Sequence, residues 1–264
     1  MIRFVAVGDL MVDITAEGTG HEARIALAAG GSALNAACCA ANLGVDTAVA
    51  GRVGDDPGGR VLLFQLAACG VRAHVGIDPV APTGTVLVVD GEIRADRGAN
   101  AEYAPEHLPA LEADAILVSG HLPEATAAAA LSRARAAWVA LDLARLSAPT
   151  AEAIVVLANE AAARRITGLA PQDAVRRLAE GRRLACVTLG GAGALVAWDG
   201  QLHHATSPPT GTDNDVPGAG DAFAATLLCE LARGATVPNA LALACDAGAG
   251  VVRAGSTAAV VGAG

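Results

Sequence analysis

The residues best suited to chemistry lie in the stretch 215–223, which reads Asp-Val-Pro-Gly-Ala-Gly-Asp-Ala-Phe. A glycine-rich turn, residues 218–220, runs directly into an apolar sequence, residues 222–233, with helical character. The first N–H groups of a helix have no partner inside it and can donate to a phosphate, and small residues let the ligand come close. The stretch therefore predicts an anion-binding turn with a carboxylate, Asp221, beside it.

Asp221 allows two interpretations. An acid in the first turn of a helix is stabilised by the helix dipole, and that role needs no ligand. Alternatively, the carboxylate is a general base that takes a proton from a hydroxyl group as this group attacks a bound phosphate. Acids are common in first turns, so the residue type alone favours the first interpretation.

A second group of candidates lies near the N-terminus. Asp9 and Asp13 follow the β-branched run 2–7, which has the pattern of a buried strand. Acids at a strand end either bind sugar hydroxyls or form a turn. A glycine pair ending at Gly31 would let a substrate lie against the backbone, and Asn35 either binds it or lies on a solvated helix face. We expect Ser32 to cap the helix that continues over residues 36–43.

Weaker patterns follow later in the chain. Arg145 stands three residues after Asp142, and an ordinary surface ion pair would explain it. A Thr-x-Gly-x-x-Gly pattern spans residues 188–193, and glycine-rich hairpin turns are common. The sequence predicts one hairpin over residues 14–29 and another over residues 83–94, the latter with an Asp-Gly turn at residues 90–91. Arg97 lies beside the second hairpin, and most arginines on a surface are solvated.

Taken in order, these motifs resemble those of the ribokinase-like (PfkB) family of carbohydrate kinases, and the resemblance covers nearly the whole chain. It implies transfer of the γ-phosphoryl group of ATP to a hydroxyl of a small sugar or sugar-like molecule. It also implies that Asp221 is the catalytic base, while the amides of Gly218, Ala219 and Gly220 hold the charge on the transferring group.

The resemblance assigns the binding residues as well. For the substrate it implies Asp13, Gly31, Asn35 and Arg97; for the nucleotide it implies Asn159, Thr188, Gly190, Gly193 and Arg145. The implied cofactors are ATP and Mg²⁺, and Asp215 matches the monovalent-cation (K⁺) site of some relatives.

One position departs from the family pattern. The family usually has Asn-x-x-Glu, the Glu helping to organise Mg²⁺, whereas Asn159 is followed here by Ala162. Glu160 would face about 200° away from that position on a helix, so the metal arrangement stays open. The loss favours an alternative, a non-catalytic sugar- or nucleoside-binding protein of the same fold. The intact Asp221 turn argues against it.

Helices are expected over residues 60–69 and about 124–137, and apolar runs and helical patterns alternate from residue 115 to residue 188. This alternation predicts an α/β doubly wound fold, a mostly parallel sheet flanked by helices. We expect residues 1–264 to form a single domain. The family resemblance implies that segments of about 13–29 and 84–98 form a small β lid over the sugar, and that two copies form a homodimer through it.

Composition excludes several other functions. The net charge is −9, so no basic field is available for nucleic acid or an anionic membrane. All 18 basic residues are arginines, which rules out Schiff-base lysines and the Gly-x-x-x-x-Gly-Lys phosphate loop.

The six cysteines lie in apolar contexts without Cys-x-x-Cys spacing, as expected in a reducing compartment, and we predict a cytoplasmic protein. An oxidoreductase is disfavoured because no Gly-x-Gly-x-x-Gly follows the first strand.

Overall fold

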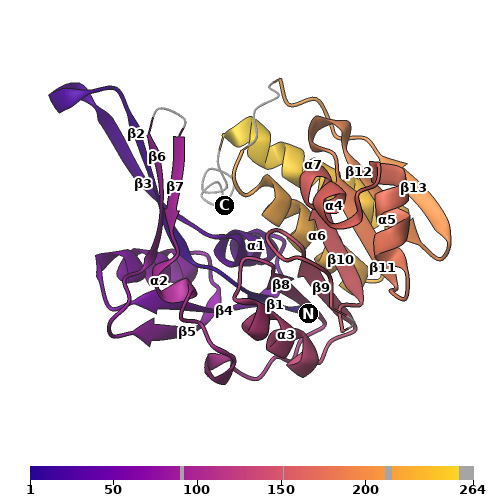
Figure 1. Ribbon diagram of the computed structural model, residues 1–264, viewed down its shortest axis with the longest axis horizontal. Coiled ribbons are helices and arrows are strands. Elements are labelled where there is room, and N and C mark those ends of the chain that lie inside the picture. The colour runs from indigo at the N-terminus through magenta and orange to yellow at the C-terminus, as the bar shows by residue number, and fades with distance from the viewer. Residues whose placement is uncertain (90–91, 151, 212–215, 256–264) are drawn as a thin grey trace.

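The computed structural model describes residues 1–264 except 90–91, 151, 212–215 and 256–264. Its centre is a nine-stranded sheet of order β5-β4-β1-β8-β9-β10-β11-β12-β13 (Figure 1). The strands are β1 Arg3–Val7, β4 Asp46–Gly54, β5 Arg72–Asp78, β8 Ala115–Ser119, β9 Trp138–Asp142, β10 Val155–Asn159, β11 Leu184–Thr188, β12 Ala194–Trp198 and β13 Gln201–Ala205. Within this nine-stranded sheet the pairs β11–β12 and β12–β13 are antiparallel, and the other pairs are parallel. The predicted α/β architecture is confirmed.

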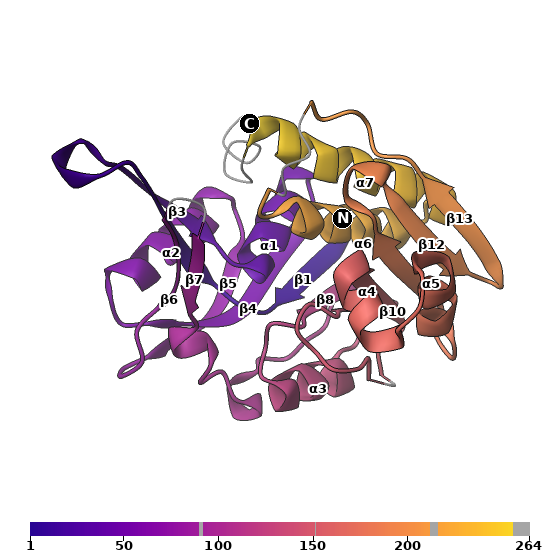
Figure 2. The same cartoon turned by 45° about the horizontal axis from the view of Figure 1, so that its top comes forward.

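Helices cover both faces of this sheet (Figures 1 and 2). One face carries α1 Ser32–Asn42, α2 Pro57–Ala68, α6 Ala219–Ala232 and α7 Val237–Ala254; the other carries α3 Glu124–Arg133, α4 Glu160–Thr167 and α5 Pro171–Ala179. Strand β1 is buried on both faces of the sheet: Phe4 and Ala6 pack in one core cluster, and Val5 and Val7 pack in the other. Successive side chains of a strand point to opposite faces, so a strand between two helical layers is apolar throughout.

A second sheet of four strands stands out from the end of the molecule formed by β4, β5 and α2 (Figures 1 and 2). Its order is β3-β2-β6-β7, with β2 Met11–Glu17, β3 Arg24–Gly30, β6 Gly84–Val89 and β7 Glu92–Asp96. Both predicted hairpins are present, joined by parallel pairing of β2 with β6. The predicted Asp-Gly turn at residues 90–91 lies outside the described residues. We call this unit the lid sheet.

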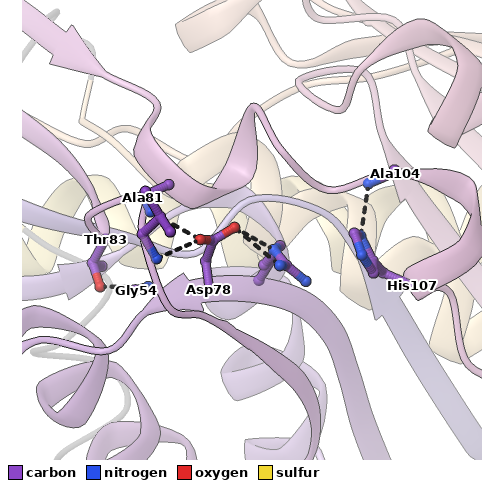
Figure 3. Close-up of polar contacts among 8 residues, drawn as sticks. Gly54, Asp78, Ala81, Thr83, Ala104 and His107 are labelled. Carbon is purple, nitrogen blue, oxygen red and sulfur yellow. Dashed lines mark hydrogen bonds and ion pairs between the residues drawn. The ribbon is translucent and has the colours of Figure 1, made fainter.

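Asp78 fixes the point at which the chain leaves the main sheet for the lid (Figure 3). Its Oδ1 accepts the N–H groups of Val80 at 2.9 Å and Ala81 at 2.8 Å, while Arg52 Nη2 lies 2.9 Å from Oδ2. The carboxylate thus terminates β5 in a defined turn and neutralises a largely buried guanidinium.

Thr83 and Asp56 make the second attachment. The Thr83 hydroxyl accepts the Gly54 N–H at 3.0 Å and donates to Asp56 at 2.7 Å (Figure 3 shows the first contact). Asp56 also accepts the Gly59 N–H at 2.8 Å and so caps α2, which begins at Pro57 rather than at the expected Arg60. Proline fits the first position of a helix, where no N–H partner is needed.

Most predicted elements are found with shifted ends. The helix expected up to Ala137 stops at Arg133, because Arg135 pairs with Glu112 in an isolated parallel bridge and the chain is extended there. No helix in the described part of the chain has the length and apolar character needed to cross a membrane.

Candidate active site

The predicted residues gather where the parallel strands end. Asp9 follows β1, Asp142 ends β9, Asn159 ends β10 and Thr188 ends β11. From β1 the chain continues to β4 on one side, and β8 lies on the other, so the topology switches beside β1. Open α/β sheets bind their ligands at the carboxyl ends of strands around such a switch point.

Asp221 lies in the first turn of α6 and is contacted by Asn35 of α1. The Asn35 Nδ2 donates to Asp221 Oδ2 at 2.9 Å, joining residues 186 positions apart. Gly218 is the N-cap of α6 with φ 91°, a left-handed conformation that favours glycine. The N–H of Ala219 donates to the carbonyl of Val216 at 3.2 Å, so this predicted phosphate donor is already engaged within the turn.

The pKa of Asp221 is raised to about 8, chiefly by burial and in addition by the nearby carboxylates of Asp142, Asp9 and Asp13, while the Asn35 hydrogen bond lowers it. Burial also raises the pKa of Asp13 to about 6, with Asp9 adding to the effect. Carboxylates from four elements therefore converge, and one of them is a strong base for its type.

Asp9 is a buried connector between β1, α1 and β8. Its Oδ1 accepts the hydroxyl of Ser32 at 2.6 Å and that of Ser119 at 3.2 Å. The expectation that Ser32 caps α1 is therefore wrong: Gly31 is the N-cap, and the Ser32 side chain bonds to Asp9 instead. Sequence reasoning missed Ser119, which no motif distinguishes from other serines at strand ends.

The paired glycines are explained by internal packing. A Cβ at Gly30 would lie 2.2 Å from Asp13 Oδ2, and a Cβ at Gly31, whose φ is 94°, would lie 2.5 Å from the carbonyl oxygen of Asp9. Close approach of a substrate is therefore not needed to account for them. They keep Asp9 and Asp13 in place at the base of the lid sheet.

Arg97, Arg145 and the carboxylate residue Glu124 line one cavity of about 280 Å³, together with Gly120, His121 and Ser147 among others. The Arg97 guanidinium donates to the carbonyl of His121, and its pKa is lowered by burial and by the nearby Arg145. Among the ion pairs of the described residues, none involves either arginine. Two positive charges thus share a cavity without a carboxylate in salt-bridge contact.

The predicted nucleotide residues have clear structural roles. Asn159 caps α4, its Oδ1 accepting the Ala162 N–H at 2.7 Å. Gly190 begins the short 3₁₀ turn after β11 and Gly193 follows it, both with positive φ, and a Cβ at Gly193 would lie 1.9 Å from the Ala205 carbonyl oxygen. Packing against β13 therefore requires glycine at position 193.

The described residues do not offer a resident metal site. Ala162 is 2% exposed and packed in the core, and Glu160 faces the surface, where it pairs with Arg164 at 3.5 Å. No group of three or more His, Cys, Asp or Glu side chains in the described ranges is arranged to hold a metal ion. Asp215, the predicted monovalent-cation ligand, lies outside the described residues.

Known proteins share both this sequence pattern and this fold. Residues 1–261 match the sequence model described as pfkB family carbohydrate kinase. The chain belongs to the pfkB family of carbohydrate kinases. This pfkB-family kinase is 33% identical to a fructokinase of Klebsiella pneumoniae, over 91% of this chain and 88% of the relative. The predicted family and kinase activity are confirmed, with the sugar unspecified.

Solved structures of ribokinases have the same fold. The ribokinase of Thermotoga maritima superposes with a TM-score of 0.84 at 23% identity, covering 98% of this chain and 96% of that one. The ribokinase of Arabidopsis thaliana, solved in complex with ribose and ATP, gives 0.80 at 24% identity, covering 98% and 95%. These likenesses establish the architecture of this pfkB-family kinase.

The raised pKa of Asp221 predicts a pH-dependent effect on stability. A carboxyl with a pKa of about 8 when folded and about 4 when unfolded binds more protons in the folded state between these values. Its contribution to stability is present below about pH 4 and is lost as the pH rises to about 8. The Asp221→Asn variant cannot ionise at this position, so it does not lose stability as the pH rises, and its amide oxygen can still accept the hydrogen bond from Asn35. We therefore expect the variant to melt several degrees above the wild type at pH 8 and at nearly the same temperature near pH 4.

The matched control is Asp173→Asn, which changes an exposed acid in the first turn of α5. We expect it to melt within about a degree of wild type at both pH values, because exposed ion pairs contribute little. An Asp221→Asn variant that melts no higher than wild type at pH 8 would show that Asp221 is an ordinary first-turn acid.

Proposed function

We propose that this kinase transfers the γ-phosphoryl group of ATP to a hydroxyl of a small acidic sugar, with Asp221 as the general base. The supporting observation is the placement of Asp221 in the first turn of α6, held by Asn35 at 2.9 Å among other carboxylates at the carboxyl edge of the sheet. A pKa near 8 makes the carboxylate basic enough to accept a hydroxyl proton near neutral pH.

The charge on the transferring group is stabilised by the helix N-terminus. Because Ala219 N–H donates to Val216, we assign this role chiefly to the amides of Gly218 and Gly220, aided by the dipole of the 14-residue helix α6. Phosphoryl transfer needs in-line positioning and charge stabilisation rather than covalent help. Mg²⁺ enters as MgATP, a substrate, because the described residues supply no ligand set of their own.

The substrate class follows from the shared cavity of Arg97 and Arg145. Glu124 also lines the cavity, but neither guanidinium is in an ion pair with it. The two guanidiniums can therefore bind a carboxylate or phosphate group with paired hydrogen bonds, whereas a neutral sugar has no use for the charge. The Ser119 hydroxyl donates to Asp9 at 3.2 Å and accepts the His121 N–H at 3.2 Å, and the His121 carbonyl accepts from Arg97, so the cavity lies next to Asp9. A sugar acid or sugar phosphate bound here would present a hydroxyl to Asp221.

The residues assigned by resemblance on the nucleotide side, Asn159, Thr188, Gly190 and Gly193, remain predicted ATP contacts, and Asp215 remains a predicted K⁺ ligand. We place the enzyme in the cytoplasm, where ATP is available, and cell fractionation would test this.

Asp221→Asn should lower the rate of ADP release in the presence of the sugar by about 10²–10⁴-fold, the usual worth of general-base assistance. ATP binding measured by calorimetry should change little. In the wild type, kcat/KM should rise with pH and level off above about pH 8, because the base must be ionised. Asp173→Asn serves as the control.

The alternative makes a different prediction. A binding protein that lost catalysis would bind sugar or nucleoside without releasing ADP at any pH. Unchanged turnover in Asp221→Asn would remove Asp221 from the catalytic role.

The substrate class is tested with a panel of neutral sugars, sugar acids and sugar phosphates. Arg97→Ala and Arg145→Ala should each raise the KM for the acidic substrate about tenfold or more, since each removes a charge-assisted pair. Arg94→Ala, which changes an exposed lid arginine paired with Glu92 at 3.0 Å, is the matched control. Activity confined to neutral sugars would contradict the proposed class, and the acid that is used distinguishes carboxylate from phosphate.

We also propose that two copies associate through the lid sheet. Ile25 and Leu27 of β3 are 72% and 55% exposed and point to the same face, since they are two residues apart in a strand. Such exposed apolar side chains are typical of association surfaces. Sedimentation at micromolar concentration should find a dimer, and Leu27→Glu should shift it to monomer; a monomeric wild type would refute the proposal.

A further inference from the structure

Two cysteines from different helices meet beside the active site. Cys38 lies in α1 and Cys69 follows the last turn of α2, and their Sγ atoms are 2.7 Å apart. A disulfide needs about 2.05 Å, so only a small movement separates the two thiols from bonding distance. Figure 1 shows α1 and α2 on the same side of the main sheet, with α2 at the base of the lid.

The pair differs from the other cysteines in access and hydrogen bonding. Cys69 is half-buried, whereas the other five are buried. The Cys69 sulfur accepts hydrogen bonds from the Cys38 thiol and, at 3.3 Å, from Gln65 Nε2. These two hydrogen bonds, chiefly the one from Cys38, lower the pKa of Cys69 to about 7. The hydrogen bond between the two sulfurs raises the pKa of Cys38. A partly exposed thiol stabilised as thiolate is the form that reacts with disulfides.

The remaining cysteines lack this combination. Burial raises the pKa of Cys39 to about 12, of Cys229 to about 12 and of Cys245 to about 11, and it also raises that of Cys186. Such thiols behave as small apolar side chains. Of the six cysteines, Cys69 alone combines partial exposure with a lowered pKa, and it lies where α1 and α2 meet.

We propose that Cys38 and Cys69 are a reversible dithiol–disulfide pair that links α1 to α2. The oxidant is a low-molecular-weight disulfide, RSSR. The Cys69 thiolate attacks one sulfur of RSSR, giving a mixed disulfide on Cys69 and releasing RS⁻. The Cys38 sulfur then loses its proton and attacks Cys69, forming the internal bond and releasing a second RS⁻. Two protein thiols are oxidised, one RSSR is reduced, and the two thiol protons pass to the two RS⁻ groups.

The position of the bond gives it a structural consequence. Helix α1 carries Ser32 and Asn35, which bond to Asp9 and Asp221, and Asn35 lies one turn before Cys38. Helix α2 contacts lid strands β2 and β3. A covalent link closing a 31-residue separation would restrict the unfolded chain and tie the base-positioning helix to the helix that supports the lid.

The test incubates the reduced, full-length protein with oxidised glutathione. Intact mass spectrometry should show the loss of two hydrogen atoms without an adduct, and digestion under non-reducing conditions should give a peptide joining Cys38 to Cys69. The melting temperature should rise by about 5–10 °C and return on addition of dithiothreitol.

Three variants make the assignment specific. Cys69→Ala should give neither the linked peptide nor the melting shift, and Cys38→Ala should stop at a glutathione adduct on Cys69. Cys39→Ala, which changes the neighbouring buried thiol, should behave as the wild type. If Cys38→Ala does not fold, the Cys69→Ala variant, which changes only a half-buried side chain, still tests the proposal. A stable glutathione adduct in the wild type, a bond from Cys69 to Cys39, or no reaction would each overturn the proposal.

Discussion

The hydrogen bond from Asn35 to Asp221 is the contact on which the site depends. It joins the first turns of α1 and α6, which lie on the same face of the sheet. It also favours the ionised form of Asp221, against burial and the neighbouring acids. Carboxylates repel one another strongly in a poorly solvated place, so a donor beside one of them affects how basic it becomes. The position of α1 is thus coupled to the chemistry of α6.

Asp9 and the glycines at positions 30 and 31 hold the start of α1 in place near the start of α6. Asp9 binds Ser32 at the start of α1 and Ser119 at the end of β8, so the helix is tied to the two central strands of the switch point. Glycines at positions 30 and 31 allow the lid strand to pass against Asp9 and Asp13. A Cβ at either would collide with protein atoms and displace an acid of the site.

Much of this arrangement was predictable. The alternation of apolar runs and helical patterns predicted the parallel sheet, and the glycine-rich sequence predicted the turn at Gly218 before the apolar helix α6, because both depend on local periodicity and backbone freedom. The cap expected at Ser32 was wrong, since a serine before a helix can bond its own turn or a distant acid, and the sequence does not say which is near. The shared cavity of Arg97 and Arg145 was split between two predicted subsites for the same reason.

The sequence by itself determined which elements form, which acid follows the glycine turn, and the absence of any lysine for phosphate or Schiff-base chemistry. These follow from residue type and short-range spacing. The tertiary structure alone decided that Asn35 meets Asp221 across 186 positions, that Arg97 and Arg145 face one cavity, and that Cys38 lies against Cys69. Burial, pKa and reactivity are set by what surrounds a side chain in space, and those neighbours come together only when distant strands and helices pack.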